Sequence, residues 1–182
     1  MKNKCLDLLV TEHKTMLRAI NVLVEMARRA VVERKLDKED ASALIEIFRV
    51  VGDDWHQGKE EGALFPVFTA GCERADVASV RHMLFEHEQD RSMMVGIEDA
   101  LQRSDATEFS DLATRLAEIL RTHIYKEDNI LFEIIDKSLS PDDDIRVVNQ
   151  FEAFDREFKE RGQDKLLHRL RMLEWKYLSK AA

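Results

Sequence analysis

The sequence has few of the residues that break helices or cross-link a chain. Its 182 residues include only 2 prolines, 6 glycines and 2 cysteines. So few prolines and glycines favour long helices over many short strands. Cys5 and Cys72 are isolated in the sequence, so neither a disulfide framework nor a thiolate metal site is indicated. Neither cysteine belongs to the cysteine–histidine constellation that nucleophilic catalysis requires.

Long apolar runs and basic clusters are also missing. No apolar stretch approaches the length of a membrane-spanning helix. The net charge of −8 argues against nucleic acid or an anionic membrane as the main partner, because both need basic patches. Residues 1–6 lead directly into an amphipathic pattern, without the apolar region and cleavage site of a secretion signal. We therefore expect a cytoplasmic protein.

The apolar residues that are present recur at helical spacing in four long segments. A chain of this length has the size of one domain. The pattern predicts helices that span roughly residues 6–29, 37–71, 73–102 (or 76–102) and 107–138. Pro66 is expected to kink or end the second of them, and Gly71 is a natural stop. Two shorter helices follow, one that opens at Pro141 and one after Gly162.

Four long helices with short connections favour an all-α fold, an up-down-up-down four-helix bundle with one or two extra C-terminal helices. We expect residues 1–140 to form the bundle and residues 141–182 to form a helical extension packed on the same domain. Two apolar stripes in the extension are expected to pack on the bundle, although they could instead form a signalling surface. These stripes are Phe151, Phe154 and Phe158, and Leu166, Leu170 and Leu173.

One ten-residue motif, His-x-x-Lys-Glu-x-x-x-Leu-Phe, begins at His56 and again at His123. On a helix, residues four apart differ by only about 40° around the axis. Each copy therefore carries an imidazole and a carboxylate on one face, the carboxylates being Glu60 and Glu127.

The repetition extends beyond this motif. Glu12-His13 in the first segment is echoed by Glu86-His87 in the third. The resulting order, one unit per helix, is what a duplicated helical hairpin would produce. Such a duplication predicts a pseudo-twofold axis through the centre of the bundle.

The repeated residues suit a dinuclear metal site. A single histidine on an apolar face is usually a hydrogen-bonded core residue, and Glu60 or Glu127 alone would be expected to pair with a neighbouring lysine. Six such residues in one correlated pattern favour metal instead, since carboxylates can bridge two ions about 3.5–4 Å apart. Nitrogen and oxygen ligands without thiolate suit two non-haem iron ions best, with manganese or zinc as alternatives. The candidate ligands are His13, His56, Glu60, His87, His123 and Glu127.

Other residues near the motifs are expected to play smaller parts. Asp90 and Arg91 are expected to form an exposed ion pair, although they could reach the edge of the site. Glu61 and Asp128 follow the candidate ligands and should lie in solvent or just behind the ligands. Trp55 and Tyr125 are expected to pack against neighbouring residues, and His82 and His168 to lie away from the site.

The motifs His13, His56-x-x-x-Glu60, Glu86-His87 and His123-x-x-x-Glu127 resemble the hemerythrin-like, or HHE cation-binding, family over about residues 5–139. The resemblance implies a four-helix bundle around a non-haem di-iron centre, with the four imidazoles as terminal ligands and the two glutamates as bridges.

Branches of this family differ in their metal-ligand residues. Oxygen-carrying hemerythrins have a further histidine one turn after the third-helix ligand, where Arg91 stands. They also have an aspartate five residues after the last histidine, at the position of Asp128. The four-histidine, two-glutamate set is similar instead to that of di-iron repair proteins linked to nitric oxide and oxidative stress.

From these patterns we expect a di-iron protein that binds or reduces small oxidants such as oxygen, peroxide or nitric oxide, with a reductant or protein partner. The alternatives are a metal- or redox-dependent sensor without turnover, oxygen or iron storage, and a structural metal such as zinc.

Overall fold

The protein was analysed as a computed structural model that describes residues 2–71 and 74–179, and the described residues contain no strand. Cys72 and Glu73, one of the predicted starts of the third helix, lie outside the described residues. The elements are α1 (Lys4–Glu33), α2 (Lys38–Ile47), η1 (Phe48–Gln57), η2 (Glu60–Leu64), α3 (Phe65–Ala70), α4 (Arg74–Arg103), α5 (Ala106–Lys126), η3 (Glu127–Leu131), α6 (Phe132–Ser138), α7 (Pro141–Glu160) and α8 (Gln163–Leu178), where η denotes a π-helix.

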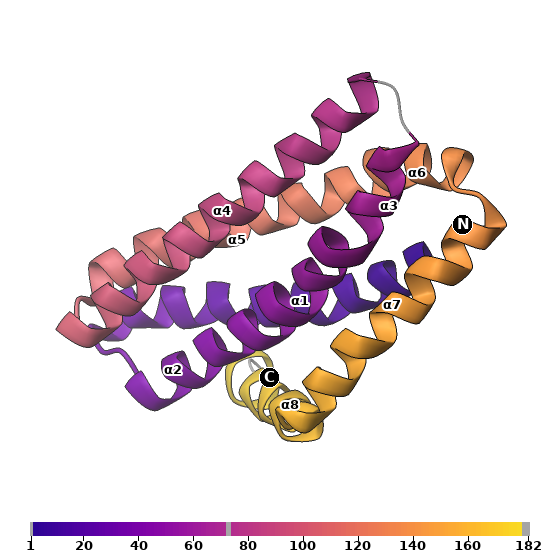
Figure 1. Cartoon of the computed structure of the whole chain (residues 1–182). Coiled ribbons are helices and arrows are strands. Elements are labelled where there is room, and N and C mark those ends of the chain that lie inside the picture. Colours follow the sequence, from indigo (N-terminus) through magenta and orange to yellow (C-terminus); the bar gives the residue numbers. More distant parts are fainter. Residues whose placement is uncertain (1, 72–73, 180–182) are drawn as a thin grey trace.

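These elements form four long helical runs, and the predicted all-α bundle is confirmed. The first and third runs are α1 and α4, the second is α2 to α3, and the fourth is α5 to α6. In the bundle, α5 packs against both α1 and α4, while α2 and η1 close the ring between α4 and α1. Figure 1 shows α4 and α5 side by side, with α1 and the second run below them.

Two of the long runs change from α- to π-helix in the middle. Of the two outcomes expected at Pro66, a kink or an end, the end does not occur, because Pro66 lies in the first turn of α3, where η2 ends, and the run continues to Ala70. At the start of a helical segment proline leaves no internal hydrogen bond unmade. Gly71 is the C-cap of α3, as predicted. The segments η2 and η3 occupy the same positions in the two copies of the repeated motif.

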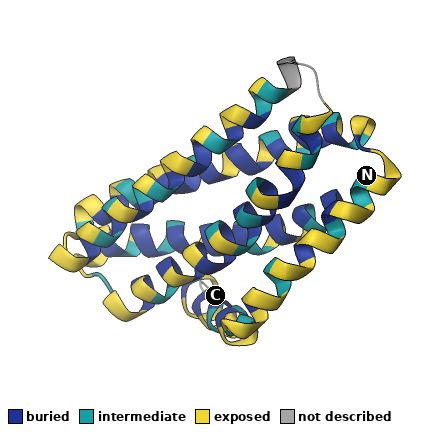
Figure 2. Cartoon of the chain, in the orientation of Figure 1, coloured by how far each residue is buried: buried dark blue, intermediate teal, exposed yellow. Residues whose placement is uncertain are grey.

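The buried apolar residues form two clusters, and a polar layer separates them. One cluster includes Met16, Val51, Met94 and Leu120, and the other includes Leu9, Ala63, Met83 and Leu131. On each of the four runs the candidate ligands lie between a member of the first cluster and a member of the second. Figure 2 shows buried residues along the inner faces of the bundle and exposed residues on the outer faces.

The C-terminal helices cover one side of the bundle. Phe151 and Phe158 of α7 and Leu170 of α8 are buried in the two clusters, so both predicted stripes pack inward. Near the N-terminal end of α7, Asp144 accepts hydrogen bonds from the backbone N–H groups of Lys4 and Cys5 at 3.0 and 2.9 Å. These bonds satisfy N–H groups in the first turn of α1 that have no partner within the helix.

Within the described ranges, no helix combines the length and the apolar character needed to cross a membrane.

Candidate metal centre

The middle of the bundle brings the six predicted ligands together in two overlapping groups. His13, His56, Glu60 and Glu127 form one group, and Glu60, His87, His123 and Glu127 form the other. In each group the potential ligand atoms lie within 4.8 Å of one another, and all six side chains are buried. The two glutamates belong to both groups, as a pair of bridging carboxylates would.

The imidazole Nε2 atoms face the two carboxylates. The Nε2 atom of His13 lies 3.2 Å from Glu127 Oε2, and that of His123 lies 3.3 Å from the same oxygen. On the other carboxylate, the Nε2 atoms of His56 and His87 lie 3.7 Å from Oε1 and 3.5 Å from Oε2 of Glu60. The Nε2 atoms of His87 and His123 are 3.2 Å apart. Imidazole nitrogens and carboxylate oxygens thus converge on one small volume.

Several of these buried atoms have no hydrogen-bond partner among the described residues. They are Nε2 of His13, Nε2 of His56 and all four carboxylate oxygens of Glu60 and Glu127. Buried polar groups left without a partner are costly, and native structures contain few of them. Metal ions bound by the two groups would give these atoms partners, so the residues present fit a dinuclear metal centre.

A carboxylate fixes the Nδ1 side of every candidate ligand histidine. Glu12 accepts from Nδ1 of His56 at 3.0 Å, and Glu86 accepts from Nδ1 of His123 at the same distance. The Nδ1 atoms of His13 and His87 lie 2.7 Å from Asp128 and Glu61. Such carboxylate contacts hold the ring orientation and leave Nε2 free for a metal ion.

These supporting carboxylates follow the pseudo-twofold repeat. Glu12 and Glu86 occupy equivalent positions before His13 and His87, and Glu61 and Asp128 each follow a bridging candidate by one residue. Glu12 and Glu86 each contact a histidine of another run. Glu12 contacts His56 of the second run, and Glu86 contacts His123 of the fourth. The echo of Glu12-His13 in Glu86-His87 was the sequence signal for this role, which the sequence interpretation did not assign.

The lysines of the repeated motif do not pair with the neighbouring glutamates. Lys59 Nζ lies 2.6 Å from Glu12 Oε1, and Lys126 pairs with Glu86. Lys59 has a second partner in α7, because Asp155 also lies 2.6 Å from Lys59 Nζ. Lys59 is consequently 1% exposed, whereas the Lys126 side chain is 24% exposed.

The pKa values in the centre reflect the crowding of charges. Burial and the neighbouring Glu127 carboxylate raise the pKa of Glu60. Burial also opposes ionisation of Glu127, but the imidazoles of His123 and His13 outweigh it and lower its pKa. For His13, burial opposes the charged form, yet the hydrogen bond to Asp128 and the nearby negative charge of Glu127 raise its pKa to about 9. A bound cation between the two carboxylates would favour ionisation of both.

Two expectations for the surrounding residues are corrected. Asp90 and Arg91 form no exposed ion pair, since Asp90 is buried with no hydrogen-bond partner among the described residues. Arg91 instead binds Asp53 and Glu61, at 2.7 Å each, because these carboxylates lie on the adjacent second run. Tyr125 is 63% exposed and does not pack in the core, because its position on α5 faces solvent.

The remaining expectations agree with the structure. Glu61 and Asp128 lie directly behind the ligands, and Trp55 packs on Phe158 with a ring-centroid distance of 4.4 Å. His82 and His168 are exposed, outside both ligand groups.

Comparison with known proteins supports this architecture. The profile of the hemerythrin HHE cation-binding domain matches residues 5–135, which is more than half of the chain. Comparisons with curated proteins and with solved structures gave no match. With the two metal-ligand groups of the bundle centre inside the matched range, the chain belongs to the hemerythrin HHE cation-binding family.

Proposed function

We propose that this protein holds two non-haem iron ions and reduces small oxidants such as peroxide, oxygen or nitric oxide. The observation that carries the proposal is the pair of four-residue groups that share Glu60 and Glu127. In this proposal His13 and His56 bind one ion, His87 and His123 bind the other, and the two glutamates bridge them. Two imidazoles and carboxylate oxygens per ion, with no thiolate, suit non-haem iron with open positions.

Each part of the chain has a defined task in this proposal. A ferrous pair held by these residues would supply the two electrons that, with two protons, reduce a peroxide. The four Nδ1–carboxylate contacts keep the Nε2 atoms aimed at the ions. Two apolar clusters flank the polar layer along the bundle. Absence of a fifth imidazole leaves the two ions with equal numbers of protein ligands, which favours reactivity over oxygen carriage.

The proposal includes a cytoplasmic location and a separate reductant, because the oxidised centre must be reduced again after each reaction. A protein partner or a small reductant would serve this purpose.

A second candidate function is a sensor without turnover, and one contact chain favours it. Asp155 of α7 binds Lys59, Lys59 binds Glu12, and Glu12 accepts from the ligand His56. A change at the metal centre would therefore reach α7 through only two intervening residues, Glu12 and Lys59.

Metal analysis and oxidation of anaerobically purified protein test both candidates. The proposed function predicts two irons per chain, their loss in His56→Ala, and repeated oxidation by peroxide, oxygen or nitric oxide when a reductant is supplied. A single oxidation that repacks α7 without turnover would favour the sensor. Fewer than two metals per chain, or zinc in place of iron, would contradict the di-iron proposal.

A further inference from the structure

A cavity of about 300 Å³, open to the surface on one side, lies between the helical runs, one helical turn from the metal centre. All four helical runs contribute to its wall. Met16 follows His13 by three residues, Asp90 follows His87 by three, Leu120 precedes His123 by three, and Gln57 is the neighbour of His56. Glu60 and Glu127 lie in the opposite direction along their helices. The cavity therefore adjoins the side of the centre away from the proposed bridges.

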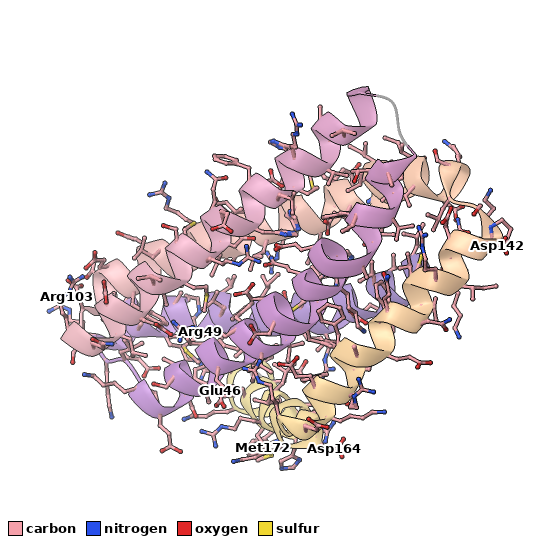
Figure 3. All side chains as sticks on the ribbon, in the orientation of Figure 1. Glu46, Arg49, Arg103, Asp142, Asp164 and Met172 are labelled. Carbon is pink, nitrogen blue, oxygen red and sulfur yellow. The ribbon has the colours of Figure 1, made fainter. Side chains whose placement is uncertain are left out.

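The inner wall of the cavity is mainly apolar, and its mouth is charged but internally paired. Met16, Phe48 and Leu120 are among the apolar wall residues. At the mouth, Arg91 binds Asp53 at 2.7 Å, and Arg49 pairs with Glu98 of α4. Figure 3 labels Arg49, which lies between the second run and α4. Because these charges are paired with one another, the mouth does not favour a charged ligand.

Asp90 is the polar exception inside the cavity. The residue is 5% exposed, and neither carboxylate oxygen has a hydrogen-bond partner in the described part of the chain. Burial raises the pKa of Asp90 to about 7, and the charges of His123, Glu86 and Glu127 also act on it, so Asp90 lies close to the centre. A buried carboxyl without a partner is costly unless something polar binds to it.

The size of the cavity argues for more than a diatomic molecule. A water molecule in the liquid occupies about 30 Å³, and pockets for small organic ligands begin at about 300 Å³. A diatomic oxidant would leave most of the apolar wall uncovered. An organic group of roughly ten heavy atoms, with one polar head, would cover the wall and reach Asp90.

We propose that this cavity binds small organic hydroperoxides, with the hydroperoxide group at Asp90 and the organic group against Met16, Phe48 and Leu120. The proposal rests on the proposed function and names its substrate class. In the reaction the O–O bond breaks, two protons are taken up, and an alcohol and a water molecule leave. The two electrons come from the proposed ferrous pair, each ion being oxidised by one electron.

Binding of a redox-inert analogue tests the cavity separately from the chemistry. Cumyl alcohol and cumene have the same apolar body, but only the alcohol has a polar head. We expect both to bind the purified protein in NMR titrations, the alcohol at least fivefold more tightly. The similarly shaped substitution Asp90→Leu should abolish this preference without weakening cumene. Failure of both molecules to bind, or equal loss of both in Asp90→Leu, would overturn the proposal.

Selectivity between large and small peroxides tests the substrate class. Stopped-flow oxidation of the ferrous protein is followed with cumene hydroperoxide and with hydrogen peroxide. A leucine at Gly52 would enter the cavity, since even its Cβ would lie 2.7 Å from the Met16 side-chain tip. In Gly52→Leu the rate with cumene hydroperoxide should fall at least tenfold relative to the rate with hydrogen peroxide. Val95→Trp, at the exposed mouth, should change the ratio in the same direction without altering the core.

A control and two contrary outcomes complete the design. Gly71→Leu, at a position with open space around the Cβ, should keep the wild-type ratio. An unchanged ratio in Gly52→Leu and Val95→Trp would overturn the cavity proposal while the proposed function stands. If neither peroxide oxidises the iron, the substrate class fails whatever the result with cumyl alcohol. The proposed function fails with it if oxygen and nitric oxide also leave the iron unoxidised.

Discussion

Lys59 and Glu12 form a buried ion pair directly behind the metal centre. Lys59 Nζ lies 2.6 Å from one carboxylate oxygen of Glu12, and the other oxygen lies 3.0 Å from Nδ1 of His56. Glu12 thus joins a cation to a candidate metal ligand. Because Lys126 and Glu86 repeat the arrangement in the other half of the bundle, the two halves give matched tests of the same contact.

Glu12→Gln should weaken metal binding at the ion held by His56. Loss of the carboxylate charge lowers the basicity of the imidazole, and changes of this type usually cost 10- to 100-fold in metal affinity. Competition with a chelator measures the affinity. Glu86→Gln should give a loss of similar size, and Glu33→Gln, exposed on the same helix as Glu12, should give none. Unchanged affinity in Glu12→Gln would refute the role assigned to this carboxylate.

Lys59→Met should destabilise the protein far more than Lys126→Met. The first change leaves the buried Glu12 without its cation, and breaking a buried pair from one side costs about 3–5 kcal/mol. Lys126 is partly exposed, so its pair with Glu86 contributes about 1 kcal/mol or less. Urea unfolding measures the two free energies of unfolding. Equal losses would show that α7 does not change the environment of Lys59.

The chelator-treated protein should lose stability as the pH rises from 6.5 to 9. In the folded chain the pKa of His13 is raised from 6.5 to about 9, and that of His123 is also raised, despite burial, by their carboxylate partners. The charged imidazoles therefore stabilise the fold fully below pH 6.5, and this stabilisation disappears as the pH passes through the folded pKa. The shift of His13 corresponds to a change on the order of 3 kcal/mol.

Metal affinity should change in the opposite direction over the same pH range. Metal binds the neutral imidazole, so the protons on His13 and His123 compete with it and are released at higher pH. His56, whose pKa is lowered by burial and by His13, changes charge below pH 6.5 and does not contribute in this range. Unfolding curves and chelator competition at pH 6.5, 7.5 and 9 measure both trends. A chelator-treated protein that becomes more stable towards pH 9 would contradict the prediction.

Gly62→Ala should loosen the contact between η2 and α7. A Cβ at this position would lie 2.8 Å from Phe154 Cζ, so the phenyl ring must move, at a cost of about 1–2 kcal/mol. Gly71→Ala has open space around the new methyl group and should be neutral or slightly stabilising. In a Phe154→Ala background the cost of Gly62→Ala should largely disappear. A cost that persists there would assign the effect to the π-helix itself.

The long helices and the six residues that meet in the candidate metal centre could be predicted from the sequence. Apolar spacing marks the helical runs, because a stable helix must bury one face, and the repeated motif places His56 and Glu60 one turn apart. A helix end at Pro66, one of the two outcomes expected there, was wrong, since local sequence gives no sign that η2 ends at α3 and the run continues. Helix periodicity predicts a face but gives no π-helical register.

The tertiary structure shows how differently Glu127 and Asp128 are placed. Both follow His123 within five residues, and the repeated motif already indicated Glu127 as the candidate ligand. In the folded bundle Glu127 is fully buried beside His13 and His123, whereas Asp128 lies behind His13 at its Nδ1 atom. Neighbouring positions on a helix point about 100° apart, so packing against the other helices decides which side chain faces inward.

The burial of Asp90 and Lys59 likewise depends on the tertiary structure. A sequence gives the period of a single helix, and from that period the six candidate ligands could be identified as a set. The sequence does not directly show which side chains from separate helices are in contact. The burial of Lys59 under α7 and of Asp90 in the cavity depends on contacts between segments far apart in the chain. Local spacing therefore determined the set of candidate ligands, and long-range packing determined which residues surround it.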